Sequence, residues 1–199
     1  MHRHIDCALV QERSCGVLCH LTRLAENSFR RGWRAGRIIE CVVLAMRRHA
    51  ENGGVQERGC GTLRNLTSDN AENEIQAGNA GAVEVVVAAI LGHTRSVTLQ
   101  LQAFQALGNI TGGNVVNTSR AGSAGAIEAL VGAMHGHAET GRMQEQACAV
   151  LCVLTYDNED NMIRAKNAGA KEAAWGALKT HSRKRTVVEE AQNLYDLLS

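Results

Sequence analysis

The sequence predicts an all-α protein built from helical repeats, and three observations lead to that prediction. The string Leu-x-x-Leu/Ile-Thr ends at Thr22, Thr67, Thr111 and Thr155, with spacings of 45, 44 and 44 residues. The string Ala-Gly-Ala recurs in the same register around Gly81, Gly125 and Gly169. Proline is absent and aromatic residues make up only 3% of the chain, which disfavours β-sandwiches and barrels. A fixed period of this length is typical of helical solenoids.

Each repeat contains three predicted helices. In the best-defined unit, apolar and small residues recur at helical spacing over 55–67 and predict a long helix. Asp69 and Glu72 resemble a capping box that opens a short helix over 71–79. A third helix over 82–91 is apolar on nearly all sides and is therefore predicted to be buried.

Repeats of this kind fill the chain, so we expect a single domain over residues 1–199. A helix over 5–24 matches the last helix of a unit, and 1–24 is therefore a partial repeat. The full repeats are 25–67, 68–111, 112–155 and 156–199, the last one ending in a helix over 186–198. Solenoid ends need polar caps, yet the last helix carries Leu194, Leu197 and Leu198. We therefore expect one or both ends to meet more chain, a second copy or another subunit.

The repeated motifs of this chain resemble those of the armadillo-repeat family. The motifs are the Val-Gln-Glu that opens the long helix at Val55, the Leu-x-Asn-Leu/Ile near its end, and the Ala-Gly-Ala-Ile/Val turn. The resemblance covers essentially the whole chain, closest to vacuolar-protein-8, importin-α and catenin arrays. It implies an armadillo-type right-handed α-solenoid, a superhelix of three-helix repeats of about 44 residues. Family members often have proline after the turn, where this chain has Glu84, Glu128 and Glu172; a carboxylate there suits the helix dipole.

The resemblance also implies a peptide-binding groove lined by the long helices. It places Asn65 and Asn109 where such arrays hold the backbone of an extended peptide. Importin-type arrays carry tryptophan where this chain has Gly16, Gly61 and Gln105, so nuclear-signal import is disfavoured. Neighbouring candidate contacts are Arg13, His20, Arg23, Arg58, Arg64, Gln102, Gln105, Glu145 and Tyr156. The alternative is that these side chains only solvate an open helix face.

Charge is distributed unevenly along the chain. The net charge is +1, but the first 54 residues hold nine arginines, no lysine and five acidic residues. Four of these arginines cluster around Trp33, namely Arg30, Arg31, Arg34 and Arg37. The pair Arg47 and Arg48 follows them. Arginine suits carboxylates, so we expect an acidic protein partner near this half; a solvated, salt-bridged surface is the alternative. Nucleic acid is disfavoured because few aromatic residues are interleaved.

Metal, cofactor and catalytic roles have weak support in the sequence. Cys15, Cys19 and His20 form a trio, but a structural zinc site needs four ligands. The seven cysteines lie in apolar helical stretches and are expected to be small core residues. His93, His137 and His181 stand 44 residues apart, too far apart to share an ion, and are expected to end helices. No nucleotide-binding loop or nucleophile elbow is present, so we expect no cofactor, no metal and no enzymatic activity.

The leading prediction is therefore a non-catalytic protein–protein interaction module or scaffold that binds an extended, acidic protein segment in its concave groove. The alternative is a structural or accessory subunit of a larger assembly that contacts its neighbours through the solenoid ends and the convex face. No signal peptide is visible, and the longest apolar runs are shorter than the ~20 residues of a membrane span. We therefore expect an intracellular protein, cytoplasmic or nuclear, without membrane insertion.

Overall fold

The computed structural model describes residues 1–24 and 34–199, apart from the side chains of His2 and Arg34. This part of the chain contains helices and connecting turns and no β-strand, as the sequence predicted. It divides into two compact units, Met1–Asn117 and Thr118–Ser199. The boundary falls within helix α8 (Val115–Ser123).

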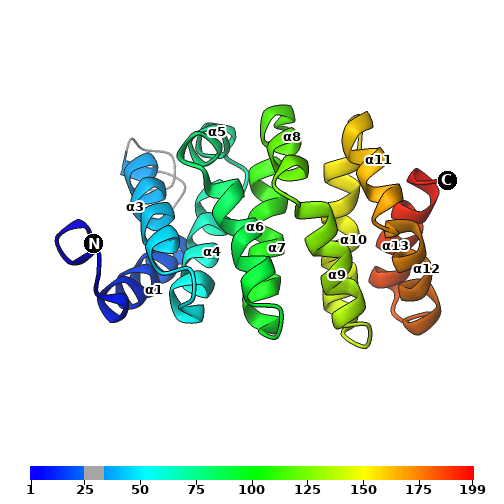
Figure 1. Ribbon diagram of the computed structural model, residues 1–199, viewed down its shortest axis with the longest axis horizontal. Helices are drawn as coiled ribbons and strands as arrows, with labels where there is room; N and C mark the ends of the chain where they lie inside the picture. Colours follow the sequence, from blue (N-terminus) through cyan, green and yellow to red (C-terminus); the bar gives the residue numbers. More distant parts are fainter. Residues whose placement is uncertain (25–33) are drawn as a thin grey trace. The chain divides into compact units, whose positions relative to one another are not determined.

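The first unit is organised around three long helices. These are α1 (Ala8–Leu24), α4 (Gly53–Thr67) and α7 (Val97–Thr111). Helix α4 packs against α1 on one side and against α7 on the other (Figure 1). The shorter elements are the 3₁₀ turn η1 (His2–His4) and helices α3 (Arg34–Arg48), α5 (Ala71–Ala80) and α6 (Ala82–Gly92). Helices α3 and α6 pack on the long helices that follow them.

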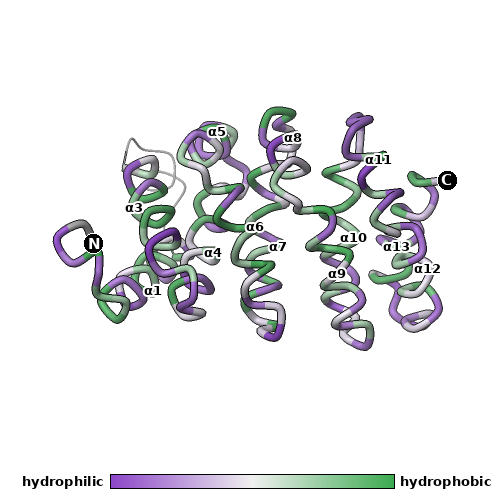
Figure 2. Tube along the Cα trace, viewed as in Figure 1, coloured by the Kyte–Doolittle hydropathy of each residue, from purple (hydrophilic) through white to green (hydrophobic). Residues whose placement is uncertain are grey.

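The second unit repeats this arrangement with two long helices. Helix α10 (Gly141–Thr155) packs against α13 (Arg185–Leu197). Helices α9 (Ala126–Gly136) and α12 (Ala170–Thr180) pack on α10 and α13 respectively, and α11 (Glu159–Asn167) connects α10 to α12. Hydropathy separates these roles within each unit, because α6 is mainly hydrophobic whereas α11 is mainly hydrophilic (Figure 2).

The helix boundaries follow the predicted pattern, with two corrections. The first helix begins at Ala8 rather than residue 5, because residues 2–4 form a separate 3₁₀ turn. The predicted capping box was wrong: Asn70 caps α5, its side chain accepting a bond of 3.1 Å from the backbone N–H of Asn73. Asp69 instead takes a left-handed conformation with φ 53° in the turn before the cap.

The recurring glycine turn has a conformational cause. Gly81, Gly125 and Gly169 each have a positive φ, between 77° and 85°, where the chain passes from a short helix into the next. Glycine adopts this left-handed conformation without the steric cost that a Cβ would bring. The Ala-Gly-Ala string is therefore required by the corner between two helices.

A buried glutamine near the start of α4, α7 and α10 holds the helix before it. The side-chain Nε2 of Gln56 donates to the carbonyls of Met46 and His49, both at 2.9 Å. Gln100 and Gln144 make the equivalent pairs of bonds to the ends of α6 and α9. These bonds satisfy carbonyls that a helix end leaves without an intrahelical partner.

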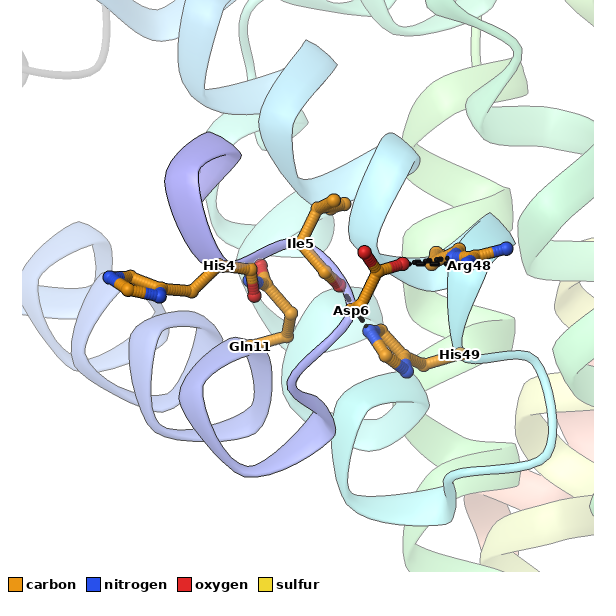
Figure 3. Close-up of polar contacts among 6 residues, drawn as sticks. All are labelled: His4, Ile5, Asp6, Gln11, Arg48 and His49. Atoms are coloured by element: carbon orange, nitrogen blue, oxygen red, sulfur yellow. Dashed lines mark hydrogen bonds and ion pairs between the residues drawn. The ribbon is translucent and has the colours of Figure 1, made fainter.

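The N-terminal residues take the place of such a helix end. Gln11 donates to the carbonyls of Met1 and His4, at 3.0 and 2.7 Å, in the same register as Gln56. His49 and Arg48 hold the same segment from α3, through bonds of 2.6 Å to the Ile5 carbonyl and 2.7 Å to the Asp6 carboxylate (Figure 3). Residues 1–5 therefore dock as the last turn of a preceding repeat would.

Histidines link successive repeats. Nε2 of His93 lies 2.7 Å from the Ala50 carbonyl, and Nε2 of His181 lies 2.7 Å from the Ala138 carbonyl. A carbonyl can only accept, so Nε2 carries the ring proton in each bond. Both histidines end their helices as predicted, and their contact with the preceding repeat is an addition that the sequence did not reveal.

Asparagines in the short helices make a parallel set of links. Nδ2 of Asn117 donates to the carbonyls of Ile110 and Glu74, both at 2.9 Å. In the second unit Asn161 donates to Leu154 and Thr118. A Cβ on Gly78 would collide with the Asn117 side chain, so the glycine is what allows this close approach.

No single helix within 1–24 and 34–199 is both long and apolar enough to cross a bilayer, although α5 and α6, bent by 71° at their junction, meet the length and composition criteria as a pair.

Candidate functional site

Most of the predicted binding residues share one surface of the first unit. Most of them are three, four or seven residues apart along their helix, which places them on the same side, and the three helices are adjacent. We call this surface the long-helix face. It comprises Arg13, His20 and Arg23 of α1, Arg58, Arg64 and Asn65 of α4, and Gln102, Gln105 and Asn109 of α7. Glu145 and Tyr156 belong to the second unit and are described separately.

Arg64 is held in position near the centre of the long-helix face. Its Nε and Nη2 donate to Oδ1 of Asn65 at 3.2 and 2.8 Å, and its Nη1 donates to Oε1 of Gln105 at 3.0 Å. These bonds use three of the five N–H groups of the guanidinium. The side chain is half-buried and has no ion-pair partner within the described residues.

The two predicted asparagines contact the preceding long helix. Nδ2 of Asn65, a residue only 8% exposed, donates to the Cys19 carbonyl at 3.0 Å and to Oγ1 of Thr22 at 3.2 Å. Nδ2 of Asn109 donates to the Arg64 carbonyl at 3.0 Å. Both N–H groups of Asn65 are thus engaged, whereas Asn109 uses one of its two. Their contact with a peptide backbone stays a prediction, and Asn109 is the better placed for it.

An open groove of about 390 Å³ lies along α1 at one edge of the long-helix face. It is lined by Glu12, Arg13, Gly16, Val17, His20, Leu21 and Arg58. A Cβ on Gly16 would lie 3.7 Å from Cδ of Arg58, so the glycine leaves room for that arginine. Sequence analysis identified Arg13, His20 and Arg58 but missed Val17 and Leu21. Their i, i+4 spacing did not reveal the groove, because an apolar stripe has this spacing whether it is exposed or buried.

The long-helix face carries uncompensated positive charge. Arg13, Arg23, Arg58 and Arg64 form no ion pair with any described residue, although Arg23 lies 3.4 Å from Nδ1 of His20. Gln102 adds a buried acceptor, Oε1, that has no hydrogen-bond partner among the same residues. Part of the predicted arginine cluster lies outside the described residues, namely Arg30, Arg31 and Trp33. The side chain of Arg34 is not described either.

The second unit carries acidic groups on its long helices. Oε2 of Glu145 accepts a bond of 2.7 Å from Oγ1 of Thr186. Partial burial, followed by the nearby Glu145 and Glu189 carboxylates, raises the pKa of Glu190. Tyr156 follows the end of α10 and is 74% exposed. Glu145 therefore lies among carboxylates, in contrast to the arginines of the long-helix face.

Three of the seven cysteines lie in the core as predicted and three are half-buried, but the prediction was wrong for Cys7, which is exposed and precedes the first α-helix. Cys15, Cys60 and Cys148 are buried, and burial raises the pKa of each thiol to about 12. Burial also raises the pKa of Cys152 to about 11. These thiols are neutral at physiological pH and pack as small apolar groups. Throughout 1–24 and 34–199, no group of three His, Cys, Asp or Glu side chains could hold a metal ion.

Comparison with known proteins identifies the fold. Over 92% of its length the chain resembles a designed armadillo repeat protein, with TM-score 0.65 and 19% identity, and covers 81% of that protein. An engineered protein from the Northeast Structural Genomics Consortium matches 98% of the chain and is covered to 94%, with TM-score 0.59 and 20% identity. A second engineered protein from that consortium matches 92% of the chain, with TM-score 0.64 and 22% identity, and is covered to 47%.

No protein-family model matches the sequence, and no curated protein matches it. The structural matches confirm an all-α, armadillo-type α-solenoid. At these identities they establish the fold alone, and they do not distinguish among vacuolar-protein-8, importin-α and catenin arrays.

Proposed function

We propose that this protein is a non-catalytic protein-interaction scaffold whose long-helix face binds an extended, acidic protein segment. The observation that carries the proposal is the set of four arginines on that face that have no acidic partner among the described residues. Arg64 is the most ordered of them, because Asn65 and Gln105 fix its guanidinium. Positive charge that the fold leaves unpaired favours a negatively charged ligand.

In the proposed binding mode, charged and amide side chains have different roles. Arg58 and Arg64 would receive carboxylates, since a guanidinium offers paired N–H groups that match a carboxylate. The amides of Gln105 and Asn109 would hold the backbone of the segment, whose N–H and C=O groups need partners once they leave water. Arg13, His20 and Arg23 would extend the same positive surface along α1.

The test uses a short fluorescein-labelled peptide of alternating glutamate and glycine, with a lysine–glycine peptide as its opposite-charge counterpart. Fluorescence anisotropy measures binding to the wild type and to the double variant Arg58→Gln/Arg64→Gln. Exposed charge pairs contribute about 0.2–1 kcal/mol each, so we expect the double variant to bind the acidic peptide about 2- to 30-fold more weakly.

The matched control is Arg95→Gln, because Arg95 is an exposed arginine of the same unit in the turn between α6 and α7. It should bind the acidic peptide as the wild type does. Equal binding of the lysine peptide, or an equal loss in the Arg95→Gln control, would show that the long-helix face is not an acidic-segment site.

A further inference from the structure

Helix α1 exposes a face that the other long helices of its unit bury. Val17 and Leu21 are 59% and 49% exposed, and Leu9 and Leu24 beside them are 61% and 68% exposed. The repeat counterparts of Val17 and Leu21 are Thr62 and Leu66 in α4, and Ala106 and Ile110 in α7, all completely buried. The face on α1 is therefore one half of a repeat–repeat joint.

The joint between α1 and α4 shows how the positions on such a face are used. Thr62 donates to the Cys15 carbonyl at 3.2 Å, and Asn65 donates to the Cys19 carbonyl. The side chain of Arg58 passes over Gly16. On α1 itself the counterparts of these three residues are Val17, His20 and Arg13, which line the open groove. The element that fits this groove is a long helix of the same repeat type.

Helix α13 is such a helix and has an uncovered side. Val187, Ala191 and Leu194 are buried within its own unit. On the remaining surface, Glu189, Gln192 and Asp196 stand at the repeat positions that Glu12, Cys15 and Cys19 hold in α1, and all three are exposed. In α1, residues at these positions contact α4 in the joint described above.

The two faces carry opposite charge. The α1 side presents Arg13, Arg58 and His20, with a single carboxylate, Glu12, among the lining residues. The α13 side presents the carboxylates of Glu189 and Asp196, and the cation paired with Glu189 is Arg185, whose Nε lies 3.8 Å from it in a largely exposed pair. Attraction between the faces supplies the orientation, and the apolar side chains of α1 supply buried area.

We infer that copies of this chain associate with one another, α13 of one copy packing in the α1 groove of the next. Each copy has one face of each kind, so the contact is heterologous, and it extends into short chains unless the rotation closes a ring. The contact is held largely by charge and is therefore reversible and weakened by salt. It shares Arg13, His20 and Arg58 with the peptide-binding surface proposed above and adds α13, which takes no part in that binding.

The experiment is sedimentation velocity on the full chain, from micromolar to millimolar concentration. At about 50 mM salt the weight-average mass should rise with concentration above the 21.4 kDa of one chain, and at about 500 mM salt it should return towards that value. A single 21.4 kDa species at every concentration and both salt levels would overturn the inference.

Charge reversal identifies the two faces. Arg13→Glu makes both faces negative, and Glu189→Arg/Asp196→Arg makes both positive, so each variant alone should stay monomeric at low salt. An equimolar mixture restores opposite charges at every contact and should associate as the wild type does. Circular dichroism of each variant confirms that it is folded before it is mixed.

Matched controls are Arg95→Glu for the first variant and Glu159→Arg/Asp160→Arg on α11 for the second; both should associate normally. Two results would contradict the packing of α13 in the α1 groove of another copy. One is a mixture that remains monomeric although both variants are folded. The other is association that strengthens with salt and survives Arg13→Glu, which would indicate apolar pairing of α1 with α1 instead.

Discussion

Arg64 of α4 and Gln105 of α7 are joined by a bond of 3.0 Å between Nη1 and Oε1, across 41 residues of chain. The same guanidinium is held from its other side by Asn65. The position of this charge is therefore set by two neutral amides rather than by a carboxylate, which leaves its charge available to a ligand.

Replacing Arg64 by lysine tests whether position matters as well as charge. Lysine keeps the charge but cannot bridge Asn65 and Gln105 with a planar fork. We expect Arg64→Lys to bind the glutamate–glycine peptide about 2- to 5-fold more weakly than the wild type, by anisotropy. Affinity equal to the wild type would mean that charge alone accounts for binding at this position.

Two glutamines of α7 should respond in opposite ways to replacement by leucine. Gln100 is completely buried and its Nε2 donates to two carbonyls, so Gln100→Leu should lower the free energy of unfolding by about 2–4 kcal/mol. Both glutamines bury an Oε1 acceptor that has no partner among the described residues, but Gln102 lacks the two donor bonds of Gln100, so Gln102→Leu should be neutral or stabilising. Urea denaturation of both variants measures the difference, and equal losses would mean that the two carbonyl bonds contribute nothing specific.

Two glycines of the second unit provide a matched pair for backbone conformation. Gly125 has φ 85° and no atom closer than 3.9 Å to an added Cβ, so Gly125→Ala should cost about 1–2 kcal/mol through backbone strain alone. Gly132, within α9, has open space around an added Cβ, and Gly132→Ala should stabilise by about 0.5–1 kcal/mol. Thermal unfolding should therefore shift in opposite directions, and a common direction would contradict the assignment of strain to Gly125.

Stability should fall at alkaline pH because of the buried thiols. Thiols in the unfolded chain ionise near pH 9.0, whereas burial raises the pKa of Cys15, Cys60 and Cys148 to about 12. Between these values the unfolded chain has released protons that the folded chain keeps, so the free energy of unfolding decreases as pH rises.

Urea denaturation at pH 8 and at about pH 10 measures this decrease. It should be smaller in Cys60→Ala than in the wild type, whatever the packing cost of that variant at pH 8. Iodoacetamide at neutral pH offers a second measurement, in which exposed Cys7 should be labelled before the three buried thiols. Rapid labelling of Cys60 in the folded protein would contradict its burial.

The docked N-terminal segment should depend on its backbone bonds more than on its ion pair. Arg48 and Asp6 pair at 2.6 Å, but both side chains are more than half exposed, so Asp6→Asn should change the free energy of unfolding by less than about 1 kcal/mol. Deleting residues 1–6 removes the acceptors of both Gln11 and His49 and should cost about 1–3 kcal/mol. Urea denaturation compares the two, and a larger loss for Asp6→Asn would reverse this order.

The fold could be predicted because its evidence lies in sequence spacing. The Thr67-to-Thr111 period and the turn at Gly81 identify repeats without any knowledge of distances. The cap at Asn70 was missed because several adjacent polar residues could cap the helix, and only the observed backbone of Asp69 decides among them.

The candidate site was harder to predict because the partners of a polar side chain depend on how closely two helices approach. Asn65 matches the pattern of a ligand-binding amide, yet its N–H groups contact Cys19 and Thr22, which lie more than 40 residues away in sequence. The groove beside Val17 was likewise invisible, since an exposed apolar stripe and a buried one have the same spacing.

The reach of the inter-repeat bonds has a consequence for how such a chain changes in length. His93, Asn109 and Asn117 each contact a carbonyl between 43 and 45 residues earlier, which is one repeat. Duplication or loss of one whole unit gives every such donor an equivalent acceptor, whereas an insertion of a few residues within a helix puts each donor whose acceptor lies on the other side of it out of step. Gene duplication in multiples of the repeat is therefore the mutational route that this architecture tolerates best.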